Sequence, residues 1–322
     1  MKAGLGRQAG QYALLLLFTL LLNFFLPRAM PGSPLAYLAG EDVGLLTPEE
    51  RREILSHHGL DQTLWRQFGL FVGNLSRGDL GHSYHRGRPV AEIIAERLPW
   101  TLLLATSALL LQTVLGVILG ARAAWSRGKR LDVWLMSTFM LFRSMPSFWI
   151  AMILLAVFGA QLGWFPMFGA FRPWAGHTGM AHIGDILRHL FLPVTSLVLL
   201  GAAETFMTMR YAMLSVLGEN YITVARAKGL SEGTVLYRHA GRNALLPVAT
   251  VFMLSLGFGI SGATIIETVF AYPGLGRLMY EAVLSRDYPL LQASFLIITV
   301  AVIIANLLAD LLYAVLDPRV RA

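Results

Sequence analysis

The sequence predicts an all-α membrane protein that crosses the bilayer several times, and its composition gives two reasons. Hydrophobic residues fill 56% of the 322 positions and charged residues only 14%, well below the roughly 25% that is usual in soluble domains. The apolar residues also gather into runs of about 20, the length that a helix needs to span a bilayer. The chain has no cysteine, which excludes disulfides, thiolate nucleophiles and cysteine-bound zinc.

Six apolar runs qualify as membrane spans. The first follows Lys2 and Arg7, as the apolar part of a signal peptide would, but no small-residue cleavage site follows it. We therefore expect an uncleaved first helix. Pro146 lies inside the third run and is expected to bend it. The six predicted spans are 11–27, 101–125, 133–160, 190–214, 244–266 and 290–314.

A small polar insert, residues 29–98, separates the first two spans. Thr47 and Glu50 have the spacing of a capping box, so a short helix is expected there, with Gly59 as its stop. Residues 90–98 have apolar positions at helical spacing and are predicted to lie along the membrane surface. The chain is thereby divided into an N-terminal helix (1–28), an insert (29–98) and a core of five spans (99–322).

The distribution of positive charge predicts the orientation in the membrane. Lys and Arg exceed Asp and Glu by 26 to 19, and the excess gathers in alternate loops. Because cytoplasmic loops are enriched in Lys and Arg, both termini and the 126–132 and 215–243 loops are predicted to be cytoplasmic. The insert is then extracytoplasmic, and 215–243 is the largest cytoplasmic segment. Basic residues placed in this way encode topology and do not indicate nucleic-acid binding.

The motifs of common catalytic and nucleotide sites are missing. The chain has no G-x-x-x-x-G-K-[ST], H-E-x-x-H or G-x-S-x-G. A G-x-G-x-x-G does occur at 257–262, but it lies inside an apolar span, where small residues serve close helix packing. The sequence therefore predicts that this chain has no nucleotide site of its own.

Four ionisable residues within the spans are candidates for function, because a charge inside a membrane is costly. Arg143 and Glu204 either line a translocation pathway or pair with each other, and the sequence leaves both alternatives open. Glu267 is a further candidate for the pathway, but for Glu267 and Asp310 an interfacial or capping role is the favoured interpretation.

The histidines of the insert are the only other candidates for a ligand site. We interpret them as exposed loop residues and predict no metal centre. They are His57, His58, His82 and His85.

The segment ARAKGLSEGTVLYRHAGRNALLP (225–247) is cationic but keeps returning to small apolar residues. The pattern predicts a helix from Tyr221, a turn at Gly229, and a second short helix capped by Ser231. Pro247 would then lie near the start of the fifth span, where its missing N–H costs little. A helix lying on anionic lipid is the alternative, but small alanines favour insertion into a protein groove.

This segment resembles the "EAA" coupling loop of importer-type ABC transporter permeases, and more narrowly that of the dipeptide/oligopeptide/nickel family. The likeness continues along nearly the whole chain, and the insert resembles the first, B-type permease of the pair. The sequence departs from the family pattern at Thr63, Thr223 and Gly241. The other similar stretches are GLDQTLWRQF (59–68), GDLGHSY (78–84), LGWFP (162–166), IIETVFAYPGLGRLMYEAVLSRDYPLLQA (265–293) and LDPRVR (316–321).

The resemblance implies a type I importer permease fold and a non-catalytic subunit in a bacterial cytoplasmic membrane. It also implies a second homologous permease, two ABC ATPase subunits that bind ATP–Mg, and an extracytoplasmic substrate-binding protein. No cofactor is expected on this chain itself. The residues that match the coupling motif are Ala225, Arg226, Ala227, Lys228, Gly229, Leu230, Ser231, His239, Asn243 and Pro247.

The cargo implied by the resemblance is a di- or oligopeptide, with nickel or another metal chelate as the alternative. An ion-coupled secondary transporter would need inverted repeats, of which the sequence shows no convincing example. An intramembrane hydrolase would need a nucleophile–base pair, and none stands out.

Overall fold

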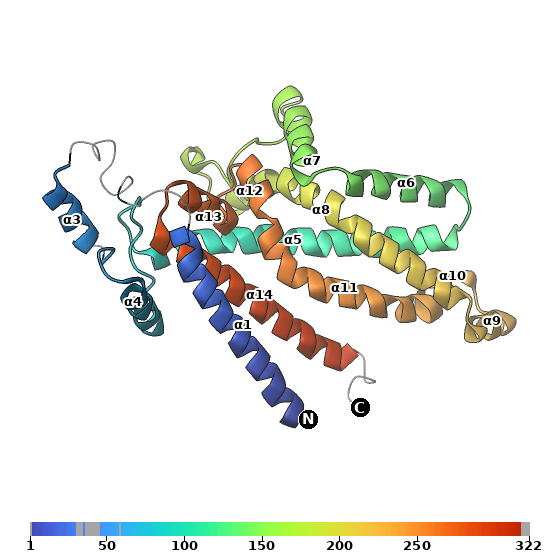
Figure 1. Ribbon diagram of the computed structural model, residues 1–322. Coiled ribbons are helices and arrows are strands. Elements are labelled where there is room, and N and C mark those ends of the chain that lie inside the picture. The colour runs from blue at the N-terminus through green and yellow to red at the C-terminus, as the bar shows by residue number, and fades with distance from the viewer. Residues whose placement is uncertain (1, 30–34, 36–45, 58, 317–322) are drawn as a thin grey trace. The chain divides into compact units, whose positions relative to one another are not determined.

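A computed structural model describes residues 2–29, 35, 46–57 and 59–316, and this part of the chain is built from helices and short loops (Figure 1). The helices that match the predicted spans are α1 (Lys2–Ala29), α5 (Val90–Trp125), α6 (Arg130–Ser144) with α7 (Ser147–Leu154) and the π-helical turn η2 (Leu155–Gln161), α8 (Gly179–Leu217), α11 (Gly241–Gly262) and α14 (Tyr288–Leu316).

Length and composition qualify three described helices as membrane spans: α5, α8 and the first 21 residues of α14. The broken pair α6 and α7–η2 passes the same test as a single span bent by 104°. The predicted bend at Pro146 is therefore confirmed, and it is a full break. The cause is local, because a residue before proline avoids the helical region, and Met145 is extended at φ −86° and ψ 140°.

The predicted surface helix over 90–98 is wrong as a separate element. These residues are the first part of α5, which runs on through Pro99. The apolar positions that suggested membrane contact, Val90, Ile93 and Ile94, are at most 4% exposed. They pack against protein, which is the other use of an apolar helix face.

The chain divides into two compact units. The first comprises residues 1–99 and 274–301, and the second comprises 100–273 and 302–322.

In the second unit α5 and α8 cross in close contact because glycines line the crossing. A Cβ atom on Gly116 would lie 2.6 Å from Cβ of Thr205, and one on Gly120 would lie 2.6 Å from the carbonyl oxygen of Phe206. Small residues four positions apart let two membrane helices approach backbone to backbone. Any larger side chain at Gly116 or Gly120 would push the helices apart.

In the first unit the insert helix α4 (Leu64–Ser76) packs on the end of α1. Phe24 is fully buried and meets Phe68 edge to face at 5.2 Å between ring centroids. The adjacent Asn23 donates a hydrogen bond of 2.6 Å from Nδ2 to the backbone oxygen of Gln292 on α14. Aromatic and polar contacts together fix α1, α4 and α14 to one another.

Buried Asp287 anchors the loop between α4 and α5. Its carboxylate accepts hydrogen bonds from the hydroxyl of Ser83 and from the backbone N–H of His85, the latter at 3.1 Å. Arg86 pairs with Glu281 of α13 (Leu275–Leu284) at 2.7 Å. The loop is thereby tied to the start of α14 and to α13.

The capping box predicted in the insert is confirmed at α3 (Pro48–His57). Thr47 N–H donates to a Glu50 carboxylate oxygen at 2.7 Å, and Glu50 N–H donates to the Thr47 hydroxyl at 3.3 Å. The bond from Thr47 N–H, and a second one that the Thr47 hydroxyl donates to the same carboxylate at 2.9 Å, hold the pKa of Glu50 below its usual value. Gly59, the predicted stop, has a left-handed φ of +64°.

Candidate functional site

The candidate site is the segment that joins α8 to α11, which we call the 218–247 element. Helix α9 (Asn220–Ala227) ends in a turn at Gly229, whose φ is +77°. The Ser231 hydroxyl then accepts a hydrogen bond from Thr234 N–H at 3.4 Å and begins α10 (Glu232–Thr234). The predicted order of helix, glycine turn and serine-capped helix is confirmed.

The sequence predicted a short second helix, separate from the fifth span. In the structure this helix does not stop before the span. A π-helical turn, η4 (Val235–Ala240), continues α10 directly into α11. Pro247 therefore lies inside a continuous helix and not near its start. Gly241 is helical, and a Cβ atom there would be 3.1 Å from the carbonyl oxygen of Leu236. Glycine thus relieves crowding in the widened turn and does not interrupt the helix.

One side of the element is buried against the rest of the second unit. Ile222 and Val235 are fully buried, and Ala225 is 5% exposed. They share one apolar core with Met209 and Met213 of α8, and the same core includes Ala121 and Ala124 of α5. Ala225, which was expected to belong to an outward apolar face, therefore packs inward, because it lies one turn from Ile222 on the same side of α9.

The opposite side, which we call the exposed face, carries both apolar and cationic side chains. Val224 is 53% exposed and Tyr237 is 68% exposed, and Leu230 is also exposed. The basic side chains of the element accompany them at exposed positions, namely Arg226, Lys228, Arg238 and Arg242. This combination suits a protein groove with an acidic rim.

Polar contacts tie the two helical arms of the element together. Asn243 donates from Nδ2 to the Tyr221 hydroxyl at 2.7 Å, which joins the start of α9 to α11. Arg226 pairs with Glu232 across the Gly229 turn at 3.3 Å. His239, also part of the motif, is partly buried on η4. The arms are held mainly by the buried core, since exposed ion pairs contribute little.

A buried ion pair beside the element escaped the sequence analysis. Arg210 of α8 donates to both carboxylate oxygens of Asp132, at 2.7 and 2.8 Å. Asp132 also accepts from Gly128 N–H at 3.1 Å, which fixes the turn before α6. The signal in the sequence was an arginine inside the fourth predicted span, but its partner is 78 residues away.

Arg143 and Glu204 do not pair in the structure, which describes both side chains. Each is exposed on the surface of this chain, Arg143 at the end of α6 and Glu204 on α8. The structural-pairing alternative is therefore not supported for them, and a role in the pathway stays a prediction.

Glu267 is fully buried in α12 (Thr264–Val269) and accepts a hydrogen bond from the Thr101 hydroxyl at 2.6 Å. The hydroxyl of Tyr272 is buried as well, and burial raises the pKa of Tyr272. The environment of Glu267 matches a structural role. The side chain of Asp310 lies outside the described residues.

Two of the four histidines considered as metal ligands have described side chains. His82 and His85 are both exposed, whereas the side chains of His57 and His58 lie outside the described residues. Among the side chains that are described, no three histidine or acidic groups come together as a metal site would require.

Comparisons with known proteins define the class. Residues 113–322 match the family of binding-protein-dependent transport system inner membrane components, and the chain belongs to this family. It is 37% identical to the di/tripeptide transport system permease protein DppB of Pseudomonas aeruginosa, over 94% of this chain and 93% of that protein. It is 36% identical to the oligopeptide transport system permease protein AppB of Bacillus subtilis, over 95% of both. The resemblance to B-type permeases of ABC transporters is thereby confirmed.

The fold agrees with a solved structure. A chain in the crystal structure of an amino acid ABC transporter with histidines superposes with a TM-score of 0.51, covering 71% of this chain and 94% of that one. At 14% identity this likeness concerns the fold alone. The predicted type I ABC permease fold is confirmed.

Proposed function

We propose that this chain is one of two membrane-spanning subunits of an ATP-driven, binding-protein-dependent importer, and that the 218–247 element couples it to an ATPase subunit. The chain itself lacks a P-loop and is taken to be non-catalytic, so ATP–Mg is bound and hydrolysed by partner subunits. The family of inner membrane components supports this assignment and does not favour an ion-coupled transporter.

The observation that carries the proposal is the two-sided construction of the element. Its buried side shares a core with α5 and α8, and its exposed face is free to enter a groove on another subunit. A push on the exposed face is therefore passed to two long apolar helices as a rigid-body movement. Alternation between inward-open and outward-open states of the transporter needs a connection of this kind.

The remaining partners follow from the same family. A second, homologous permease completes the pathway, and a substrate-binding protein docks on the extracytoplasmic side, on the insert and on the 163–189 and 270–289 segments. Both termini are proposed to be cytoplasmic. Arg143 and Glu204 stay the candidates for lining the pathway, because both side chains are exposed on the isolated chain.

The proposed cargo is a short peptide. The relatives that align over nearly the full length carry the names of di/tripeptide and oligopeptide permeases, which supports peptides over nickel or a metal chelate. Uptake of a labelled dipeptide, a labelled oligopeptide and ⁶³Ni by the reconstituted transporter tests the choice. Nickel uptake without peptide uptake would contradict it.

Gly229 offers a sharp test of coupling because a Cβ atom there would meet no atom of this chain within 4 Å. Both Gly229→Ala and Gly229→Trp place a side chain at positive φ, at a cost of roughly 1 kcal/mol. The two variants are compared at equal abundance in the membrane. If Gly229→Trp lowers uptake at least tenfold more than Gly229→Ala, the additional loss indicates a clash with a partner subunit.

Gly128 supplies the matched control for this test. It also has φ +77° and open space around it, but it lies in the turn between α5 and α6. Gly128→Ala and Gly128→Trp should resemble each other in uptake. Equal uptake by Gly229→Trp and Gly229→Ala would remove the coupling assignment.

A further inference from the structure

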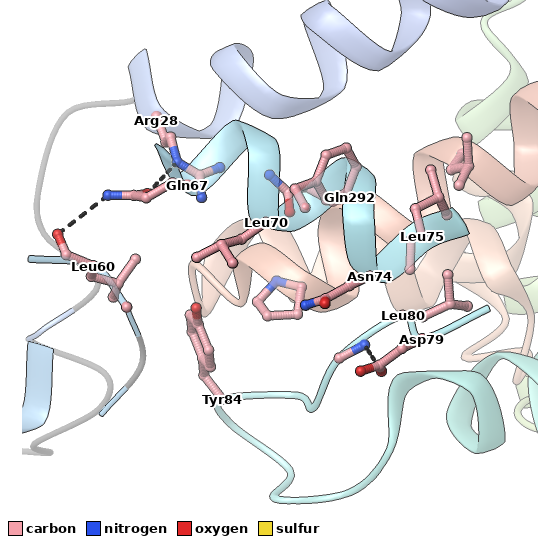
Figure 2. Close-up of a pocket in the computed structure, with 16 residues that line it drawn as sticks. Arg28, Leu60, Gln67, Leu70, Asn74, Leu75, Asp79, Leu80, Tyr84 and Gln292 are labelled. Carbon is pink, nitrogen blue, oxygen red and sulfur yellow. Dashed lines mark hydrogen bonds between the residues drawn. The ribbon is translucent and has the colours of Figure 1, made fainter. Parts of the chain in front are cut away.

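A cavity of about 190 Å³ lies within the first unit (Figure 2). The end of α1, helix α4, the loops on either side of α4 and the start of α14 surround it. Leucine side chains form much of its wall, and polar side chains come from α1, α4, the loop after α4 and α14. The polar residues of the wall are Arg28, Gln67, Asn74, Asp79, Tyr84 and Gln292.

Arg28 brings a positive charge to this cavity. Its Nε donates to Gln67 Oε1 at 3.1 Å, its Nη1 donates to the Phe24 carbonyl oxygen at 3.0 Å, and its guanidinium lies 3.7 Å above the Phe24 ring. Among the described residues, no carboxylate pairs with Arg28. A guanidinium has five N–H donors, so a prepositioned part of the fork stays available to an anion.

Gln292 lines the same cavity from α14 and has an unused donor. Its side chain is 5% exposed, and its Nε2 has no hydrogen-bond partner in the described part of the chain. A buried donor left unpaired is costly, so a ligand that accepts from it removes that cost on binding. Asp79, the one acid among the described residues of the wall, is exposed and accepts from Gly81 N–H at 2.8 Å.

Tyr84 adds a neutral hydroxyl to the wall. Burial raises the pKa of Tyr84 to about 12, so its phenol stays protonated at physiological pH. Together with Arg28, Gln292 and Asn74 it makes the polar part of the cavity rich in N–H and O–H donors, as recognition of an anionic oxygen requires.

The position of the cavity along the helices points to the membrane–water interface. Arg28 comes at the end of the apolar stretch Leu14–Ala29 of α1. On α4 the large side chains of Leu64, Trp65 and Leu70 are at least 50% exposed. Trp and Leu on one helix, next to an arginine that ends a span, are typical of the headgroup level of a bilayer.

We propose that this cavity binds the phosphate headgroup of a membrane phospholipid. The free part of the Arg28 guanidinium and the Gln292 amide donate to the phosphate oxygens, and the leucine wall, including Leu70 and Leu75, receives the start of the acyl chains. A phosphodiester fits because it combines a delocalised anion, which a guanidinium binds at two oxygens, with an apolar body. The site is separate from the 218–247 element and does not depend on the cargo.

Native mass spectrometry of the purified, assembled transporter with dioctanoyl-phosphatidylglycerol tests the proposal. Arg28→Ala and Gln292→Leu should each weaken binding about tenfold or more. Arg66→Ala is the matched control, because Arg66 is an exposed arginine of α4 that does not line the cavity. Gln292→Leu removes a buried amide donor that has no partner among the described residues, so its thermal stability should not fall while its lipid binding does. Unchanged binding in both cavity variants would overturn the proposal.

Three further ligands separate the lipid from other sources of the same chemistry. Dioctanoylglycerol, which lacks the phosphate, should bind at least tenfold more weakly, and equal binding would overturn the headgroup assignment. Inorganic phosphate or a dipeptide with a free carboxylate should not displace the lipid at millimolar concentration. Displacement by phosphate would assign the cavity to the free ion, displacement by the dipeptide would assign it to cargo, and either result would overturn the lipid site.

Discussion

The 218–247 element and the Arg28 cavity differ in whether their polar groups lie on the surface or face the interior. In the element, apolar side chains such as Ile222 and Val235 face inward and the cations face outward. In the cavity, Arg28 and Gln292 face inward, whereas Leu64 and Trp65 of α4 are exposed and do not line it. The difference indicates two kinds of recognition. In our proposals, the element offers a rigid surface for another protein, whereas the cavity encloses part of a small ligand.

The largest expected effect concerns the buried ion pair that joins α6 to α8 beside the element. Asp132→Ala or Arg210→Ala leaves the other charge buried without its partner, which should lower the free energy of unfolding by roughly 3–5 kcal/mol. Thermal unfolding in detergent and peptide uptake measure this effect. The double variant Asp132→Leu/Arg210→Met should recover most of the stability, because a well-packed apolar pair can replace a buried ion pair.

A single variant with wild-type thermal stability would contradict this expectation. Recovery of stability without recovery of uptake would sharpen the comparison, because it would mean that the ion pair also orients the element.

An intermediate effect is expected for the change of stability with pH, through Tyr84 in the wall of the cavity. Tyr84 has a pKa of about 12 in the folded chain, against an ordinary value of 10.0. The folded state therefore holds its proton more tightly, so the contribution to stability is complete below pH 10 and is lost as pH rises toward 12. Two pKa units correspond to ~2–3 kcal/mol.

Thermal unfolding between pH 8 and pH 11 measures the effect of Tyr84, and Tyr84→Phe should flatten the alkaline fall. A fall of equal size in both proteins would locate its cause elsewhere. Lipid binding in the cavity should stay constant from pH 7 to pH 9.

The smallest effect is expected for the exposed polar tie of the element. Tyr221→Phe removes the hydrogen bond from Asn243, which water can replace, so the cost should be no more than about 1 kcal/mol. Ile222→Ala, in the buried core of the same helix, should cost roughly 2–5 kcal/mol. A larger loss for Tyr221→Phe than for Ile222→Ala, by thermal unfolding, would show that polar ties hold the arms.

The sequence by itself determined the fold class, the six apolar helices and the order of turns in the 218–247 element. These features depend on local physics: the length of an apolar run, the capping of α3 by Thr47 and Glu50, and the positive φ that glycine permits at Gly229. The motif of the element also carried the family resemblance, which the comparisons confirmed.

Only the tertiary structure decided which face of each helix is buried. Ala225 packs inward, α5 begins at Val90, Arg210 pairs with Asp132, and Gln292 lines a cavity with Arg28. The residues of the ion pair are 78 positions apart in the sequence, and the two cavity residues are farther apart still. Periodicity reveals that a helix has an apolar side, but the neighbour that covers it, and the partner of a buried charge, depend on how distant segments pack.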